Sequence, residues 1–376
     1  MALEILEGWT HYDQNDILVK WDTLNDYSHI LISAAYGRNG AGASILTGGA
    51  SVGHNLRTSY AIGTAPSVMF EKYFSSNITN INIGFAIKLN DVELGDIMPL
   101  FSLIDTSLSA QAVFTRYFLQ QISLILTPQQ QLVFCSGNTR NRPLLIVGPY
   151  SPPIKRGVFS YIEVATSIGT PGAISLWIDG KAIFAGESVT TQSTVNAYAG
   201  GIRFFHHLGY AAAYQRNYYI DDIYVATSGG RFSDVTIETA LPNDGGAIRQ
   251  WTPSDGGTLN YDMVNELSPN DDIDYNTATA AGNIDTYKYP ALANTAGTIH
   301  GVTINAVGMN KDNTAGSIML KGVYREGGVN YETAWQQMGT IIYKDNIFGY
   351  LTNPATGNPF TISEVNAAEL GIDRVT

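Results

Sequence analysis

The stretch RNYYIDDIYVA, residues Arg216–Ala226, determines how the rest of the chain is divided. Its apolar and polar residues alternate, and this alternation is typical of a half-buried β-strand. Immediately after it, Ser228-Gly229-Gly230 ends the alternation and begins a polar segment, beyond which a second series of strand-like runs starts. We therefore predict a first domain over residues 1–228, a connecting segment over 229–250 and a second domain over 251–376.

Length and composition agree with two β-rich domains. A chain of 376 residues exceeds what one hydrophobic core usually serves. Charged residues make up only 14% of the chain, against about a quarter in an average soluble domain, while glycine (38) and tyrosine (22) are abundant. This composition favours sheets and turns over helices.

Charge and cysteine content exclude several classes of protein. The formal net charge of −12 argues against a nucleic-acid partner, because phosphate binding requires concentrated Lys and Arg. The single cysteine, Cys135, excludes an intramolecular disulfide, and we expect it to be a small buried hydrophobic residue. Residues Met1–Glu7 lack a signal-peptide pattern, and no apolar run approaches the ~18 residues of a membrane span. We therefore expect synthesis in the cytosol and no membrane insertion.

The first domain contains about ten short strand-like runs with no amphipathic helix between them. In one of them, residues 81–88, isoleucine and phenylalanine alternate with Asn82, Gly84, Ala86 and Lys88, which gives one apolar and one more polar face. The strongest hairpin signal is Ile174–Ile178, the turn Asp179-Gly180 and Lys181–Phe184. The pattern favours an all-β fold, an antiparallel sandwich of jelly-roll type, over a parallel sheet.

The second domain repeats this style in a smaller β-sandwich-like unit. Near its end, Thr361 and Glu364 have the spacing of a capping box before a short C-terminal helix, and Gly371 stands where a helix C-cap is expected. Strands are predicted at Val235–Thr239, Ile284–Tyr287, Ile299–Val307, Ile318–Tyr324 and Ile341–Tyr343.

Asp221 and Asp222 are the first candidates for a metal site. Adjacent residues of a strand point to opposite faces, so the two carboxylates are not expected to share one site. A calcium site stays open as an alternative if Asp222, or Asp221 in the other register, joins backbone carbonyls of a neighbouring loop. The pair His206-His207 meets the same geometric objection, and Asn270–Asp274 lacks the residue order of a calcium loop.

Enzymatic motifs are missing from the sequence. A glycosidase needs two facing carboxylates, but the strand around Glu163 carries one. There is no Gly-x-Ser-x-Gly, no His-Glu-x-x-His and no phosphate-binding loop, since Gly37-Arg38-Asn39-Gly40 is not followed by Gly-Lys-Ser/Thr. We therefore predict no catalytic residues, no cofactor other than the open calcium alternative, and a protein that is not an enzyme.

Several segments resemble one family. Gly37–Gly40, Ser175–Gly180 and Tyr219–Val225 are similar to the concanavalin A-like, laminin-G-like sandwich found in many bacteriophage virion proteins. The segments that resemble the part following this sandwich are Gln250–Ser254, Asn260–Glu266, Asp271–Tyr275, Asp285–Tyr287 and Asn353–Thr361. The resemblance implies a concanavalin A-like fold for the first domain.

The same resemblance implies a non-enzymatic structural component of a tailed-phage virion, in the tail, neck, baseplate or a fibre-associated appendage. Its localisation would be the virion, its partners other virion proteins and further copies of itself, with a role in host-surface contact. Two alternatives stay open: a capsid decoration protein, and a carbohydrate-binding adhesin in which Tyr210, Tyr214 or Tyr218 stack on host-surface glycan. A polysaccharide-degrading enzyme is the third class and is not favoured.

Overall fold

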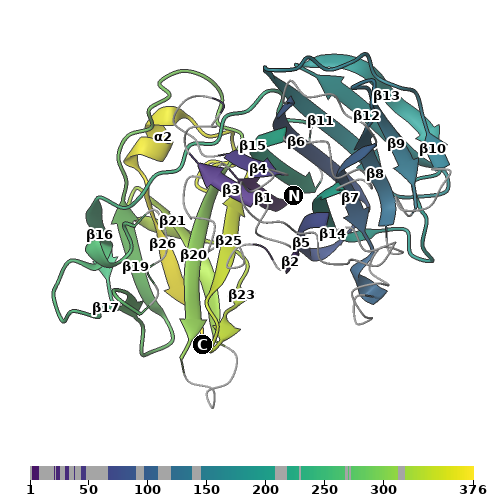
Figure 1. The fold of residues 1–376 in the computed structure, drawn as a ribbon. Coiled ribbons are helices and arrows are strands. Elements are labelled where there is room, and N and C mark those ends of the chain that lie inside the picture. The colour runs from purple at the N-terminus through teal and green to yellow at the C-terminus, as the bar shows by residue number, and fades with distance from the viewer. Residues whose placement is uncertain are drawn as a thin grey trace, which may run out of the picture. The chain divides into compact units, whose positions relative to one another are not determined.

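The computed structural model shows an almost entirely β protein (Figure 1). The structure describes residues 2–7, 21, 23–25, 30–33, 38, 44–47, 67–89, 97–108, 120–137, 145–207, 218–227, 230–266, 270, 272–311 and 318–376. Strand β1 is Ala2–Glu7. The chain then divides into a sandwich unit within Trp21–Ile237 and a C-terminal unit within Glu238–Thr376. No helix among these described residues is long and apolar enough to cross a membrane.

The sandwich unit contains two antiparallel sheets, here called sheet A and sheet B. Sheet A has the strand order β13 (Lys181–Val189), β12 (Gly172–Ile178), β11 (Phe159–Ser167), β6 (Asn80–Leu89), β15 (Tyr218–Thr227), β4 (Ser44–Thr47) and β3 (Ile30–Ser33). Sheet B has the order β10 (Leu145–Val147), β9 (Leu132–Ser136), β8 (Gln120–Leu126), β7 (Met98–Ile104), β14 (Ala199–His207), β5 (Ser67–Ile78) and β2 (Thr23–Asn25). A short 3₁₀-helix, η3, covers Thr106–Leu108.

Phenylalanine rings join the two sheets. Phe85 on β6 contacts Phe101 on β7 and Phe204 on β14, with ring centroids 6.2 Å apart in both pairs and nearly perpendicular planes. All three side chains are fully buried. Edge-to-face packing of this kind stabilises a core beyond the burial of area alone. The all-β sandwich of jelly-roll type predicted for the first domain is therefore confirmed.

Local sequence signals account for the hairpins. Strands β12 and β13 pair around Asp179 and Gly180, whose φ angles of 51° and 74° are those of a two-residue hairpin turn. The Asp179 carboxylate accepts a hydrogen bond from the Tyr161 N–H at 2.7 Å, which fastens the turn to β11. The predicted hairpin is confirmed. Cys135 on β9 is buried, as expected.

The C-terminal unit is built from shorter sheets. Its main sheet has the order β16 (Asp244–Arg249), β19 (Asn283–Lys288), β26 (Glu369–Arg374), β21 (Met319–Glu326) and β22 (Val329–Glu332), with β23 (Gln336–Gln337) beside β21. A second sheet joins β24 (Gly339–Thr340), β20 (Val302–Asn310) and β25 (Lys344–Tyr350), and a third joins β17 (Thr252–Pro253) and β18 (Asn276–Thr277). A 3₁₀-helix, η5, covers Asn260–Met263.

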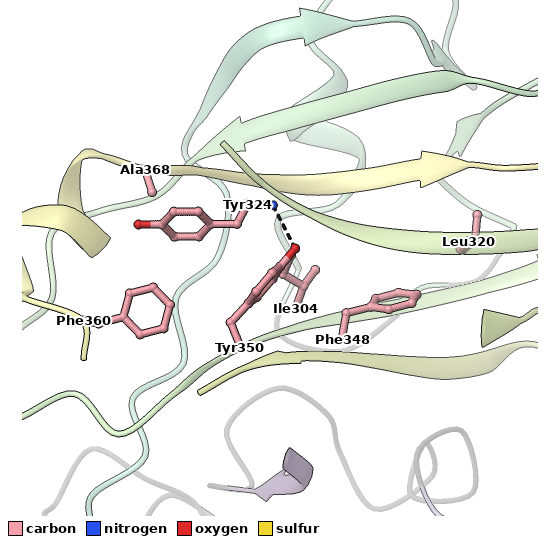
Figure 2. Close-up of a cluster of buried hydrophobic side chains, with 7 residues drawn as sticks. All are labelled: Ile304, Leu320, Tyr324, Phe348, Tyr350, Phe360 and Ala368. Carbon is pink, nitrogen blue, oxygen red and sulfur yellow. Dashed lines mark hydrogen bonds between the residues drawn. The ribbon is translucent and has the colours of Figure 1, made fainter. Parts of the chain in front are cut away.

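A cluster of buried side chains forms the core of this unit (Figure 2). The ring of Tyr324 packs against those of Phe360 and Tyr350, with centroid distances of 5.6 Å and 5.8 Å. The Tyr350 hydroxyl accepts from the Tyr324 N–H at 3.1 Å and donates to the Gly322 carbonyl at 3.0 Å, so its polar end is satisfied inside the core. The second, smaller β-domain is thus confirmed as part of the fold.

Two of the strands predicted for the second half are wrong. Residues 235–239 form no strand, because their backbone groups bond to side chains of the sandwich unit: Arg38 Nη1 donates to the Val235 carbonyl at 2.9 Å. The Ile237 N–H donates to the Asp222 carboxylate at 2.8 Å. Residues 341–343 are also irregular, since Ile341 has a φ of 57° and cannot continue an extended strand.

The C-terminal helix starts as predicted and ends earlier. Helix α2 covers Ile362–Ala367, and Thr361 and Glu364 form the complete capping box. Among the described residues it is the only α-helix. The expected C-cap at Gly371 is wrong, because Gly371 lies in β26 opposite Thr286 of β19. A Cβ at Gly371 would overlap the Asp285 carbonyl oxygen, so the glycine permits close approach of two strands.

Candidate functional site

Sheet A turns one face to the core and the other, its outer face, away from sheet B. Phe85 packs in the core, so Gly84, Ala86 and Lys88 of the same strand point outward. The residues paired with them on the neighbouring strands share the outer face: Glu163, Tyr161 and Phe159 on β11, and Tyr224, Asp221 and Tyr219 on β15. Aromatic and charged side chains therefore gather on this face.

Glu163 is a hydrogen-bonding centre of the outer face and is only 1% exposed. Its Oε1 accepts from the Tyr224 hydroxyl at 2.9 Å and from the Ser233 N–H at 2.7 Å. Its Oε2 accepts from Arg231 Nη1 at 2.6 Å, and the Arg231 guanidinium stacks 4.8 Å from the ring centroid of Trp177. The single carboxylate of this strand thus anchors the chain segment that follows β15.

Asp221 and Asp222 lie at a β-bulge. The register of β15 against β6 shifts between Asp221 and Tyr224, and Asp222 has a φ of 50°. A bulge inserts an extra residue and breaks the alternation of faces. Both carboxylates therefore meet Arg38: Asp221 Oδ2 accepts from its N–H at 2.8 Å, and Asp222 Oδ2 from its Nη1 at 3.3 Å. The prediction that the two carboxylates lie on opposite faces is wrong.

Arg38 supplies the positive charge beside these aspartates. Burial raises the pKa of the Asp222 carboxyl above its ordinary value, against the opposing effects of the Ile237 N–H and Arg38. For Arg38, burial lowers the pKa, but the hydrogen bond and charge of Asp234 outweigh it, so the guanidinium pKa is raised overall. Within the described ranges, no group of three or more His, Cys, Asp or Glu side chains is arranged to hold a metal ion.

Two buried tyrosines support this part of the face. Tyr161 and Tyr224 are at most 1% exposed, and the Tyr161 hydroxyl donates to the Asp222 carbonyl at 3.2 Å. Burial raises the pKa of both hydroxyls above the ordinary value for tyrosine. Gly84 leaves the room they need, since a Cβ there would overlap the Tyr224 ring. These tyrosines therefore act as packed supports of the sheet.

The Lys88 corner, defined by Lys88, Phe159 and Tyr219, is the half-buried end of the outer face. Lys88 Nζ lies 5.0 Å from the ring centroid of Tyr219 and 5.7 Å from that of Phe159. The chain before β11 returns to this end of β6, because the Gly157 N–H donates to the Leu89 carbonyl at 2.9 Å. The corner thus offers two aromatic rings and an ammonium group from three adjacent strands.

The aromatic residues singled out from the sequence are not those of the corner. Tyr210 and Tyr214 lie outside the described residues. Tyr218 begins β15, but its side chain also lies outside the described part, as do those of His206 and His207 at the end of β14. Sequence reasoning missed Tyr219, although its place in an alternating strand was a usable signal.

The acidic loop of the C-terminal unit is irregular, as expected. The Asp272 carboxylate is exposed and accepts a hydrogen bond from the Tyr343 hydroxyl at 3.0 Å. Asp271 lies outside the described residues. The contact joins the loop to the segment before β25.

A buried aspartate organises the N-terminal part of the C-terminal unit. Asp285 is fully buried, and its Oδ1 accepts from the N–H groups of Gln250 and Trp251 at 2.7 and 2.8 Å. Its Oδ2 accepts from Asn260 Nδ2 and from the Tyr287 hydroxyl. Four donors satisfy the carboxylate, so this site is structural.

Comparisons with known proteins concern the fold. No family model matches the sequence, and no curated protein does. Among solved structures, an endo-β-1,4-glucuronan lyase from the fungus Trichoderma reesei is 12% identical with a TM-score of 0.42, and the match covers 55% of this chain and 91% of that one. An alginate lyase from a Chlorella virus is 10% identical with a TM-score of 0.41, covering 60% of this chain and 100% of that one.

A third structural neighbour is the catalytic domain of a glycoside hydrolase family 131 protein from Coprinopsis cinerea, 10% identical with a TM-score of 0.35, covering 57% of this chain and 85% of that one. At these identities and scores the likeness concerns the fold and assigns no activity to this chain.

The neighbours nevertheless contradict two predictions. We expected a non-enzymatic structural component of a tailed-phage virion, with capsid decoration as an alternative, whereas the neighbours named here are two polysaccharide lyases and a hydrolase domain. The virion role and the absence of enzymatic activity are therefore withdrawn. The family resemblance, the virion localisation and the assembly into oligomers stay predictions.

Proposed function

We propose that the sandwich unit binds a carbohydrate chain at the Lys88 corner. One observation carries the proposal: Phe159 and Tyr219 project from two strands that flank β6, on the same side of one sheet, and both are half-buried and reachable from solvent. The apolar face of a sugar ring packs on aromatic rings, and the amphipathic character of tyrosine suits a surface that is partly wet. Lys88 between the rings adds three hydrogen-bond donors.

The sheet gives this corner a rigid foundation. Phe159, Lys88 and Tyr219 occupy directly opposed positions of antiparallel strands, so their spacing is fixed by the backbone ladder. Further along the same face, the contacts of Glu163 and Asp222 hold the rest of the outer face in place. A binding site on strands with locked neighbours needs little reorganisation when the ligand arrives.

Affinity electrophoresis in gels that contain polysaccharides tests the proposal. We expect the full chain to be retarded by at least one polysaccharide of a chemically broad panel, and Phe159→Ala and Tyr219→Ala each to weaken binding about tenfold. Trp335→Ala is the control, because Trp335 is 54% exposed and belongs to the C-terminal unit. Loss of retardation in the control alone, or no retardation by any member of the panel, would refute the proposal.

The same panel also tests for cleavage. Each polysaccharide is incubated with the full chain and followed for new reducing ends and for the absorbance of unsaturated products. One polysaccharide can both retard the protein in the gel and be cleaved by it. If the Lys88 corner binds the polysaccharide chain that is cut, Tyr219→Ala should lose both the retardation and the cleavage.

A further inference from the structure

Lys88 contacts aromatic rings, whereas Arg38 and Arg231 on the same outer face form ion pairs with carboxylates. Arg38 contacts Asp222 and Asp234, and Arg231 contacts Glu163. In the described part of the chain, no carboxylate lies within ion-pair distance of Lys88, whose recorded partners are the rings of Phe159 and Tyr219. A half-buried ammonium held between two rings therefore keeps its capacity to bind an anion.

The carboxylates nearby on the outer face already accept hydrogen bonds from backbone N–H groups. Asp221 accepts from the N–H groups of Arg38 and Asp222, at 2.8 and 2.9 Å. Asp179, in the turn beside β11, accepts from the Tyr161 N–H at 2.7 Å. Each of these carboxylates is therefore held by the backbone of the outer face.

The backbone of two more basic residues comes close to the end of β6. Arg156 forms a β-bridge with Leu89, and the Gly157 N–H donates to the Leu89 carbonyl, which brings Lys155 and Arg156 to the end of β6. Lys155 is exposed.

We infer that the Lys88 corner selects sugars that carry a negative charge, a carboxylate or a sulfate, over neutral sugars; this rests on the carbohydrate binding proposed above. The sugar ring stacks on Tyr219 or Phe159 while its acidic group meets the Lys88 ammonium. Hydrogen bonds between ionised groups are about twice as strong as neutral ones, which gives the charged sugar its advantage.

The net charge of −12 acts against this selection only at long range. At physiological ionic strength, repulsion between exposed charges is largely screened beyond about 8 Å. A contact at Lys88 is shorter than this and is partly shielded from solvent by the two rings. The local ion pair therefore decides which sugar is preferred, and the overall charge affects mainly the rate of encounter.

Two matched ligand pairs test the inference with the full chain. One pair is a polyuronate and its carboxyl-reduced form, and the other is dextran sulfate and dextran. Both are measured at about 0.15 M salt, which is physiological ionic strength. We expect the charged member of one pair to bind about tenfold more tightly than its neutral partner, and the pair that shows this preference identifies the anion. Equal affinities within both pairs overturn the inference and leave the proposed function standing. No binding of any member refutes the proposed function itself.

Variants assign the preference to Lys88. Lys88→Gln should lower affinity for the charged sugar about tenfold and change that for the neutral sugar less than about twofold, whereas Lys88→Arg, which keeps the charge, should retain most of the preference. Lys344→Gln is the control, because Lys344 is exposed on β25 of the C-terminal unit. Equal losses in Lys88→Gln and Lys344→Gln would mean a general charge effect and overturn the inference. Melting temperatures and circular dichroism establish that each variant is folded.

Discussion

Replacement of Glu163 is the most informative test of how the outer face is held. The carboxylate is 1% exposed and accepts from the Tyr224 hydroxyl, the Ser233 N–H and Arg231. Glu163→Ala removes every acceptor. Glu163→Gln keeps an amide oxygen that can accept from the same tyrosine and backbone donors. It replaces the oxygen that accepts from Arg231 with an amide N–H₂ group, so both the charge and the hydrogen bond to Arg231 are lost. The two variants therefore separate the hydrogen bonds to Tyr224 and Ser233 from the ion pair with Arg231.

The structure sets the size of both effects. In Glu163→Ala the Tyr224 hydroxyl and the Ser233 N–H lose their acceptor, at about 1–3 kcal/mol each, so the free energy of unfolding should fall by about 4 kcal/mol. Arg231 is 30% exposed and can turn to water, so its lost charge partner costs little. Glu163→Gln should therefore cost about 1 kcal/mol, in the range of partly exposed ion pairs.

Urea titration at neutral pH, followed by tryptophan fluorescence and circular dichroism, measures these free energies. Glu187→Ala on β13 is the control, because Glu187 is exposed, and it should stay within about 0.5 kcal/mol of the parent protein. If Glu163→Ala and Glu163→Gln agree within about 0.5 kcal/mol, the bonds to Tyr224 and Ser233 do not stabilise the fold and the reasoning fails.

Three further results are expected. Gly84→Ala should lower the free energy of unfolding by about 1–3 kcal/mol, because its Cβ would overlap the Tyr224 ring; an unchanged urea midpoint would contradict this. The free energy of unfolding should fall as the pH rises above about 10, where the tyrosines of the unfolded chain ionise. Burial raises the pKa of Tyr161 and Tyr224 in the folded protein, so above this pH only the unfolded chain releases these protons. An ultraviolet titration in which these tyrosines ionise before the protein unfolds would contradict the prediction. Thr361→Ala should cost about 1 kcal/mol in thermal unfolding, since the hydroxyl accepts from the Glu364 N–H, and Thr361→Ser should restore most of it; equal stabilities of the two variants would exclude the cap as a contributor.

The features predicted correctly from the sequence depend on local chemistry. Asp179 and Gly180 determine their turn through their own backbone preferences, and Thr361 and Glu364 cap their helix across one turn of chain. The outward face of β6, including Lys88, also follows from alternation within a single strand. Such signals need no knowledge of which strands become neighbours.

The errors arise where distant segments meet. Alternation placed Asp221 and Asp222 on opposite faces, but a bulge brings both to Arg38, which is 183 and 184 residues away in sequence. The corner formed by Lys88, Phe159 and Tyr219 depends on the register of three strands that are far apart in the chain. A single sequence does not determine such a register, so the corner could not be predicted.

The residues that carry the resemblance to virion sandwiches explain why the fold was predicted and the function was not. Arg38, in the first of the similar segments, pairs with Asp222 in another, and Asp179, in a third, fastens a hairpin to β11. These contacts stabilise the sandwich whatever ligand it binds. Lys88 and Phe159 contribute no contact of this kind, since they face outward at the open end of the sheet. Folding constrains the first set of residues, and the binding we propose would constrain the second. A likeness that rests on the first set therefore predicts the architecture and contains no information about a ligand.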